Sequence, residues 1–148
     1  RIWSRAFRKQ QATAITAAIR SNNPQNLPVI AVGDFNSHKW TNPSNAPYDV
    51  MVGAGLIDPL GNTYKADLPS GQATVEKRIR TNFDSYNGFL SKANARNDFG
   101  NGTYIDYIFT SKMRVSEWET VANVDSNRNF IGVIPSDHNM IRATVGLP

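Results

Sequence analysis

Two short motifs, about one hundred residues apart, carry side chains suited to phosphoester hydrolysis. The first is Gly33-Asp34-Phe35-Asn36. If the backbone stays extended through Phe35, Asp34 and Asn36 point to the same side of the chain. A carboxylate beside an amide can orient a water molecule and donate a hydrogen bond to a phosphate oxygen. Glycine, aspartate and asparagine also favour turns, so this motif alone leaves a structural turn equally open.

The second motif is Ser136-Asp137-His138. The Asp137 carboxylate is a hard oxygen ligand suited to Mg²⁺, Mn²⁺ or Ca²⁺. The neighbouring His138 could act near neutral pH as a general base or as a stabiliser of developing charge. The alternative is a Ser-Asp cap with an incidental histidine. Because Pro135 precedes the motif and a predicted strand follows it, we expect a loop tip, where both interpretations hold.

Asp106 interrupts the otherwise apolar strand segment Tyr104-Ile105-Asp106-Tyr107-Ile108-Phe109. An unpaired carboxylate is costly to bury. A histidine that directs its N–H to this carboxylate would be oriented and made more basic, as in an Asp-His catalytic pair. We favour this pairing over an Asp106 that faces solvent on an edge strand. The other histidine, His38, lies four residues after Asp34 and could contact substrate, although a loop histidine is more often merely exposed.

The elements that must position these residues follow from apolar periodicity. Apolar side chains at helical spacing predict a helix from Ser4 to about Asn22, and the Pro- and Asn-rich stretch from Thr41 to Pro47 is a predicted loop. The β-branched run Leu27–Val32 lacks alternation, which predicts a strand buried on both faces. Tyr48 to Gly55 is a short helix candidate, and Leu56 to Asp58 a brief strand.

The second half of the chain is predicted to be mostly strand. Asn62 to Asn101 is polar and irregular, and such long stretches are more often functional than not. Three strands are expected at 104–109, 115–124 and 138–147. In the last, Met140, Arg142, Thr144 and Gly146 share one face, and Ile141, Ala143 and Val145 share the other. Early helices and late strands indicate an α/β fold with helices packed outside a sheet.

Composition sets broad limits. A chain of 148 residues that is 40% hydrophobic has the size and apolar content of one globular domain. Its net charge of +4 mildly favours polyanionic partners. The absence of cysteine excludes disulfides and thiolate metal sites; it is compatible with a cytosolic protein and with a secreted bacterial protein, which we favour slightly. No apolar run is long enough to be a transmembrane segment.

The three motifs together, in their order and spacing, resemble the endonuclease/exonuclease/phosphatase superfamily. This DNase-I-like group includes apurinic endonucleases, sphingomyelinases and inositol-phosphate phosphatases. The resemblance covers nearly the whole chain. It implies a four-layer α/β sandwich, with mixed, mostly antiparallel sheets flanked by helices, and Mg²⁺-dependent (or Mn²⁺- or Ca²⁺-dependent) hydrolysis of phosphoesters.

The resemblance also implies a role for each matched residue. Asp34 would position or activate the attacking water, and Asn36 would bind the scissile phosphate. Asp137 would help to hold the metal. His138 would contact the phosphate or act as the acid/base group, and Asp106 would orient His138.

The chain departs from the superfamily pattern in length. A catalytic domain of this kind is usually about twice as long, and its N-terminal half supplies an asparagine, the metal-binding glutamate and a second histidine. None of Glu76, Glu117 and Glu119 stands in the context of that glutamate. We therefore expect residues 1–148 to be the C-terminal portion of such a domain, that is, a fragment or a processed product that opens at Arg1 without an initiator methionine. Its N-terminal half would be supplied in cis or by a separate chain.

One carboxylate and one histidine cannot hold Mg²⁺ tightly, so we expect the isolated chain to be inactive. For the complete protein, a nuclease is favoured over a sphingomyelinase-like or inositol-phosphatase-like enzyme. The basic excess and the aromatic residues between Phe83 and Phe99 suit a loop that contacts nucleic acid, although they could instead cover the sheet. The cluster Glu76–Arg80 could bind phosphate or be solvated surface. A catalytically inactive binding module of the same fold is the remaining alternative.

Overall fold

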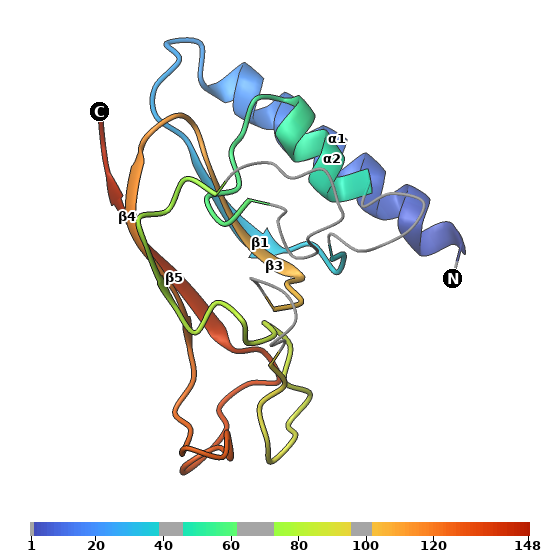
Figure 1. Ribbon diagram of the computed structural model, residues 1–148. Helices are drawn as coiled ribbons and strands as arrows, with labels where there is room; N and C mark the ends of the chain where they lie inside the picture. The colour runs from blue at the N-terminus through green and yellow to red at the C-terminus, as the bar shows by residue number, and fades with distance from the viewer. Residues whose placement is uncertain (1, 39–45, 62–72, 96–101) are drawn as a thin grey trace.

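The computed structural model describes residues 2–38, 46–61, 73–95 and 102–148. These residues form two helices and five strands (Figure 1). In chain order the elements are α1 (Ile2–Asn22), β1 (Ile30–Asp34), α2 (Ala46–Gly53), β2 (Lys77–Ile79), β3 (Asp106–Thr110), β4 (Arg114–Val121) and β5 (Met140–Gly146).

The strands form two sheets. In the first, β1 pairs antiparallel with β3. In the second, β4 lies between β2, to which it is parallel, and β5, to which it is antiparallel. Figure 1 shows α1 and α2 on one side of the β1–β3 sheet and the β4–β5 pair on its other side. The described residues thus form three layers, helix, sheet and sheet, of the predicted four-layer α/β sandwich.

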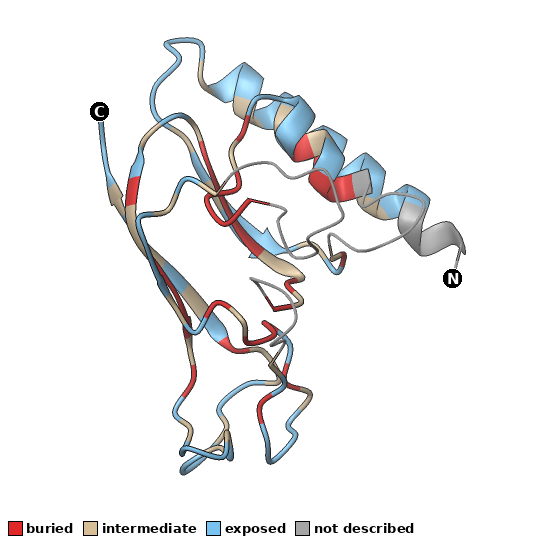
Figure 2. Ribbon diagram, viewed as in Figure 1, coloured by how far each residue is buried: buried red, intermediate tan, exposed pale blue. Residues whose placement is uncertain are grey.

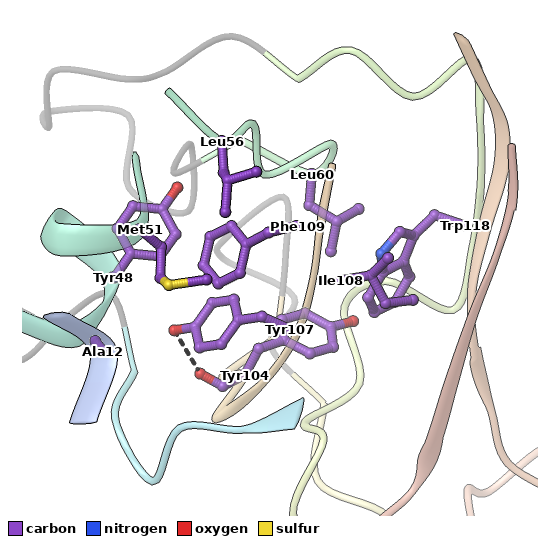
Figure 3. Packing of buried hydrophobic residues seen from close by; sticks show 10 residues of the cluster. All are labelled: Ala12, Tyr48, Met51, Leu56, Leu60, Tyr104, Tyr107, Ile108, Phe109 and Trp118. Atoms are coloured by element: carbon purple, nitrogen blue, oxygen red, sulfur yellow. Dashed lines mark hydrogen bonds between the residues drawn. The ribbon is translucent and has the colours of Figure 1, made fainter. Parts of the chain in front are cut away.

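The main core lies on both sides of β3. Side chains alternate along a strand, so Tyr107 and Phe109 share one face, where they stack with ring centroids 5.2 Å apart. Tyr48 of α2 packs against both rings (Figure 3). Just before β3, Tyr104 packs edge-on against Trp118 of β4, with ring centroids 5.0 Å apart. The cluster of buried residues comprises Ala12, Tyr48, Met51, Leu56, Leu60, Tyr104, Tyr107, Ile108, Phe109 and Trp118.

Most predicted elements are confirmed, with shifted ends. The predicted helix 4–22 is α1, and α2 begins at Ala46 because Pro47 is tolerated in a first helical turn. The rest of the predicted loop, residues 41–45, lies outside the described residues. The brief strand at 56–58 is reduced to one bridge between Ile57 and Thr110. Strand 115–124 is β4, and strand 138–147 is β5, whose exposed and half-buried faces alternate as predicted.

One prediction about β1 is wrong for the described part of the chain. The run 27–32 was expected to be buried on both faces, but the strand begins at Ile30 and Val32 is 69% exposed. Figure 2 shows most of β1 in the colour of exposed residues. Among the described residues, β1 pairs with β3 alone, so no strand lies along its other edge and neighbouring side chains cover it from one side only. In addition, β2 lies in the stretch predicted to be irregular, because three residues with two charges give no apolar pattern.

None of the described helices is long and apolar enough to cross a membrane.

Candidate functional site

Three of the predicted site residues meet where β1 ends and β3 begins. The antiparallel register places Asp34 opposite Asp106. His138 precedes β5, and its Nδ1 atom lies 2.9 Å from Asp106 Oδ2. Each of the three side chains offers one ligand atom, and these atoms lie within 4.8 Å of one another. The structure thus brings together two carboxylates and an imidazole from distant parts of the sequence.

The Asp34–Asn36 segment is a hydrogen-bonded turn. Asn36 has a left-handed backbone with φ of 47°, so the chain does not stay extended past Phe35. The Asn36 amide N–H donates to Asp34 Oδ1 at 2.7 Å, and Asn36 Nδ2 donates to Asp34 Oδ2 at 2.9 Å. The two side chains therefore meet through the turn rather than through an extended backbone. The sequence left open whether this motif is a structural turn or a functional pair. The two interpretations are compatible, because the turn brings the Asp34 carboxylate and the Asn36 amide together.

The turn is tied to β3 and to the core. The Phe35 N–H donates to the Ile105 carbonyl at 2.8 Å, and the Tyr107 hydroxyl donates to the Ser37 carbonyl at 2.9 Å. The Phe35 ring packs edge-on against Phe109 and Tyr107 at centroid distances of 5.5 and 5.6 Å. The apolar side chain within the motif thus fixes the polar side chains on either side of it.

The pKa of His138 is raised above its ordinary value. The main cause is the hydrogen bond to Asp106, which stabilises the imidazolium; partial burial opposes it, and the negative charges of Asp106, Asp34 and Asp137 add to it. The side chains of His138 and Asp106 are 27% and 17% exposed, so solvent screens this pair only in part. Asp106 engages Nδ1, so Nε2 is the ring nitrogen that this hydrogen bond leaves unused.

The structure does not bring the other two predicted site residues into this group. Among the described residues, the cluster of acidic and histidine ligands is limited to Asp34, Asp106 and His138. Asp137 contributes its backbone instead: its carbonyl accepts the N–H groups of Asn87 and Gly88 at 2.7 and 3.0 Å. His38 is half-buried in the loop after β1.

A hard divalent cation fits the chemistry of these groups but not their number. The exposed Asp34 carboxylate offers oxygen, the ligand atom that Mg²⁺ and Ca²⁺ prefer, and each of its oxygens keeps a lone pair beyond the bond from Asn36. Asp106 is committed to His138. The described residues thus provide one side of a cation site, whereas such ions take about six or more oxygens in total.

A set of buried polar residues behind the site was missed by the sequence analysis. Asp84, Ser85, Asn87 and Asn139 are all buried. Ser85 Oγ accepts the Asp106 N–H at 3.3 Å, and the Ser85 carbonyl accepts the Asn139 N–H at 2.7 Å. Ser85 therefore links the start of β3, which carries Asp106, to the residue that follows His138.

Asn87 links the same loop to the second motif. Its Nδ2 donates to the Ser136 carbonyl at 3.0 Å and to Asn139 Oδ1 at 3.1 Å, and its Oδ1 accepts the Phe89 N–H at 2.8 Å. Asn, Asp, Ser and Gly give no periodic pattern, so the only signal in the sequence was the length of the irregular stretch.

The charged cluster 76–80 has structural partners. Lys77 Nζ lies 2.9 Å from Glu117, Arg80 Nη1 lies 3.4 Å from Glu119, and Arg114 Nε lies 2.7 Å from Glu76. Arg142 of β5 joins both glutamates of β4. We call this set, Glu76, Lys77, Arg80, Arg114, Glu117, Glu119 and Arg142, the charge ladder. It agrees with the solvated-surface interpretation rather than with phosphate binding.

With this geometry in view, comparison with known proteins identifies the family. The model of the Endonuclease/Exonuclease/phosphatase family matches residues 1–138. The chain belongs to this family. No curated protein matches the chain.

Two solved structures share the fold of this family member. The mannosyl-6-phosphatase Bt3783 of Bacteroides thetaiotaomicron VPI-5482 superposes with a TM-score of 0.67 at 21% identity, over 95% of this chain and 46% of that one. A conserved protein of unknown function from Enterococcus faecalis V583 gives a TM-score of 0.58 at 17% identity, over 95% of this chain and 44% of that one. The chain thus spans less than half the length of either protein.

Proposed function

We propose that this chain provides part of the active site of a divalent-metal-dependent phosphoesterase, most favourably a nuclease. The observation that supports this is the Asp106–His138 pair, which lies within 4.8 Å of Asp34. A carboxylate, an oriented imidazole and an amide are the groups needed to activate water and to bind a phosphate. Membership of the Endonuclease/Exonuclease/phosphatase family agrees with phosphoester chemistry.

Each side chain has a distinct proposed role. Asp34 accepts a proton from the attacking water or orients that water. The second N–H of Asn36 Nδ2, beyond the one donated to Asp34, donates to a phosphate oxygen. Because Asp106 favours the imidazolium, His138 is able to hold phosphate charge or supply a proton to the leaving oxygen near neutral pH.

The proposed cation is Mg²⁺, with Mn²⁺ or Ca²⁺ as alternatives. Asp34 is the described residue best placed to provide an oxygen ligand, and Asp137 stays a predicted ligand. A bound divalent cation would supply Lewis-acid polarisation of a phosphoryl oxygen and neutralise charge.

We further propose that residues 1–148 are the C-terminal portion of a larger catalytic domain. The chain spans 46% of the phosphatase that shares its fold, and Ile30 and Val32 of β1 expose 45% and 69% of their surface. An N-terminal half, in cis or as a separate chain, would complete the cation site and cover these side chains. Phosphodiesterase activity of residues 1–148 alone with Mg²⁺, abolished by His138→Ala, would contradict this proposal. A secreted location stays a prediction.

Nucleic acid is the favoured substrate on the basis of the net charge of +4. A sugar-phosphate esterase is the second candidate, suggested by the name of the mannosyl-6-phosphatase. A lipid phosphoesterase and an inactive binding module remain alternatives to both.

The test uses the complete polypeptide that contains this chain, assayed on DNA, RNA and a hexose phosphate with Mg²⁺ and again with excess EDTA. We expect EDTA to abolish hydrolysis and Asp34→Asn or His138→Ala to lower kcat by about 10²- to 10⁴-fold. Asp49→Asn, an exposed aspartate on α2, is the matched control and keeps wild-type kcat. Full activity in either site variant would reject the proposal, and substrate binding without turnover in the wild type would favour the binding module.

A further inference from the structure

The loop that follows Ser85 presents two aromatic side chains to solvent, and one of them, Tyr86, lies against His138. The side chains of Tyr86 and Phe89 are 49% and 63% exposed. Large aromatic side chains contribute most to stability when they are buried, so two exposed rings on one loop, one of them in contact with a candidate catalytic histidine, indicate a contact surface. We call Tyr86 and Phe89 together the aromatic shelf.

Tyr86 is held in place on two sides. Its ring centroid lies 5.3 Å from that of His138, edge to face at 76°, and the two residues form an antiparallel bridge. On another side the ring lies against Gly88, where an added Cβ would come within 3.2 Å of it. Gly88 also has φ of +61°, which favours glycine. A ring fixed in this way can bind a partner without first being ordered, which lowers the entropic cost of binding.

Phe89 is held by its backbone rather than by its ring. Its φ of 58° is unusual for a large side chain, and the Asn87 side chain stabilises this conformation by accepting the Phe89 N–H at 2.8 Å. Burial of the ring does not explain this conformation, because the ring is mostly exposed. A strained conformation that turns an aromatic ring to solvent, three residues after Tyr86 on the same loop, is a feature that ligand contact would explain.

We infer that the aromatic shelf stacks on a ring that is joined to the scissile phosphate, either a nucleobase or the pyranose of a sugar phosphate. This inference rests on the proposed function, since it takes the phosphate to be bound at His138. Tyr86 contacts that histidine directly, so a ring attached to a phosphate bound there is within reach of the shelf. Flat aromatic faces bind bases by stacking without reading their identity. An acyclic ester offers no such face, so the shelf selects for substrates that carry a ring.

The test measures kcat and KM of the complete protein on two matched pairs of substrates. The first pair is a short oligonucleotide and its counterpart with abasic residues on both sides of the scissile phosphate. The second is a hexose 6-phosphate and glycerol phosphate. The variants are Tyr86→Ala, Tyr86→Phe and Phe89→Ala, with Leu147→Ala as the control, because Leu147 is 70% exposed and follows the end of β5.

For the pair of substrates that the protein hydrolyses, we expect Tyr86→Ala to raise the KM of the ring-bearing substrate about tenfold. The KM of the substrate without a ring should stay within about twofold of the wild-type value. Tyr86→Phe retains wild-type KM because it keeps the ring. The pair that shows the effect identifies the source of the ring as nucleic acid or sugar.

Equal effects of Tyr86→Ala on ring-bearing and ringless substrates would overturn the inference. So would an unchanged KM together with a lower unfolding midpoint, since that result would mean that the ring is buried in the complete domain. Failure of the wild type to hydrolyse any of the four substrates would instead reject the proposed nuclease and sugar-phosphate esterase functions.

Discussion

Among the described residues, charged side chains gather in the Asp106–His138 pair and in the charge ladder, and these two regions differ in how far their cationic side chains are exposed. The site pair is 17% and 27% exposed and has buried polar residues behind it. In the ladder, the Glu117 and Glu119 side chains are also mostly covered, at 21% and 12%, but the Lys77 and Arg114 side chains are 65% and 68% exposed. Exposed ion pairs contribute little to stability because water and salt screen them. The ion pairs of the ladder that involve these exposed cations are therefore expected to add little to stability, although their contact distances are as short as that of the site pair.

The two regions also differ in which groups titrate near neutral pH. The pKa of Glu117 is lowered, mainly by its hydrogen bond with Lys77, and that of Arg142 is raised, mainly by its hydrogen bond with Glu119. Both groups are already fully charged at neutral pH, so these shifts do not change their protonation there. The raised pKa of His138 moves a group whose ordinary value lies near neutrality, so its protonation does change. Only the site pair can serve proton transfer.

The largest effect is expected when the site pair loses its carboxylate. Asp106→Asn in the complete protein should lower kcat by about a hundredfold, because His138 loses the group that orients it and favours its protonated form. NMR titration of the metal-free protein, with His138→Gln to identify the signal, should show that the pKa of His138 falls. An unchanged pKa would mean that the pair seen here does not form.

The same substitution predicts a pH dependence of stability. The pKa of His138 is higher in the folded than in the unfolded protein, so the pair stabilises the fold fully below the unfolded-state pKa, about 6.5 for histidine. This contribution is lost as the pH rises through the folded-state pKa. The difference in free energy of unfolding between wild type and Asp106→Asn should therefore be larger at pH 6 than at pH 9, as measured by urea denaturation.

A smaller effect is expected at the polar residues behind the pair. Asn87→Ala removes a buried hydrogen bond to Asn139 Oδ1 and two part-buried ones, to the Ser136 carbonyl and from the Phe89 N–H. A buried polar group that loses its partner costs about 1–3 kcal/mol. We expect the free energy of unfolding to fall by about 2–3 kcal/mol in urea denaturation.

The matched control is Asn123→Ala, which removes one exposed hydrogen bond to the Ile131 carbonyl and should change little. Equal losses of stability in Asn87→Ala and Asn123→Ala would show that burial does not set the cost of losing these hydrogen bonds.

The smallest effect is expected in the charge ladder. Lys77→Ala removes one exposed partner of Glu117 and should leave the urea midpoint unchanged at neutral pH. Because the folded-state pKa of Glu117 is lowered, any contribution is present above the unfolded-state pKa of glutamate and is lost as the pH falls through the folded value. A loss of stability as large as that of Asn87→Ala would contradict the proposed distinction.

The sequence by itself determined the elements that have strong apolar patterns and the motifs that lie at their ends. The spacing in α1, the apolar run of β3 and the alternation in β5 each depend on local side-chain order, which is visible without the fold. Asp34 and Asp106 were identifiable as site candidates because each is a carboxylate directly after or within an apolar strand.

Only the tertiary structure decided which polar residues support the site. Asp34, Asp106 and His138 come together through the pairing of β1 with β3 and the course of the chain into β5, which are contacts between distant segments. Ser85, Asn87 and Asn139 have polar side chains that favour turns in any sequence, so their role appears only when burial and partners are known. The exposure of Val32 has the same origin, because a β-branched run predicts a strand and its neighbours decide whether that strand is covered.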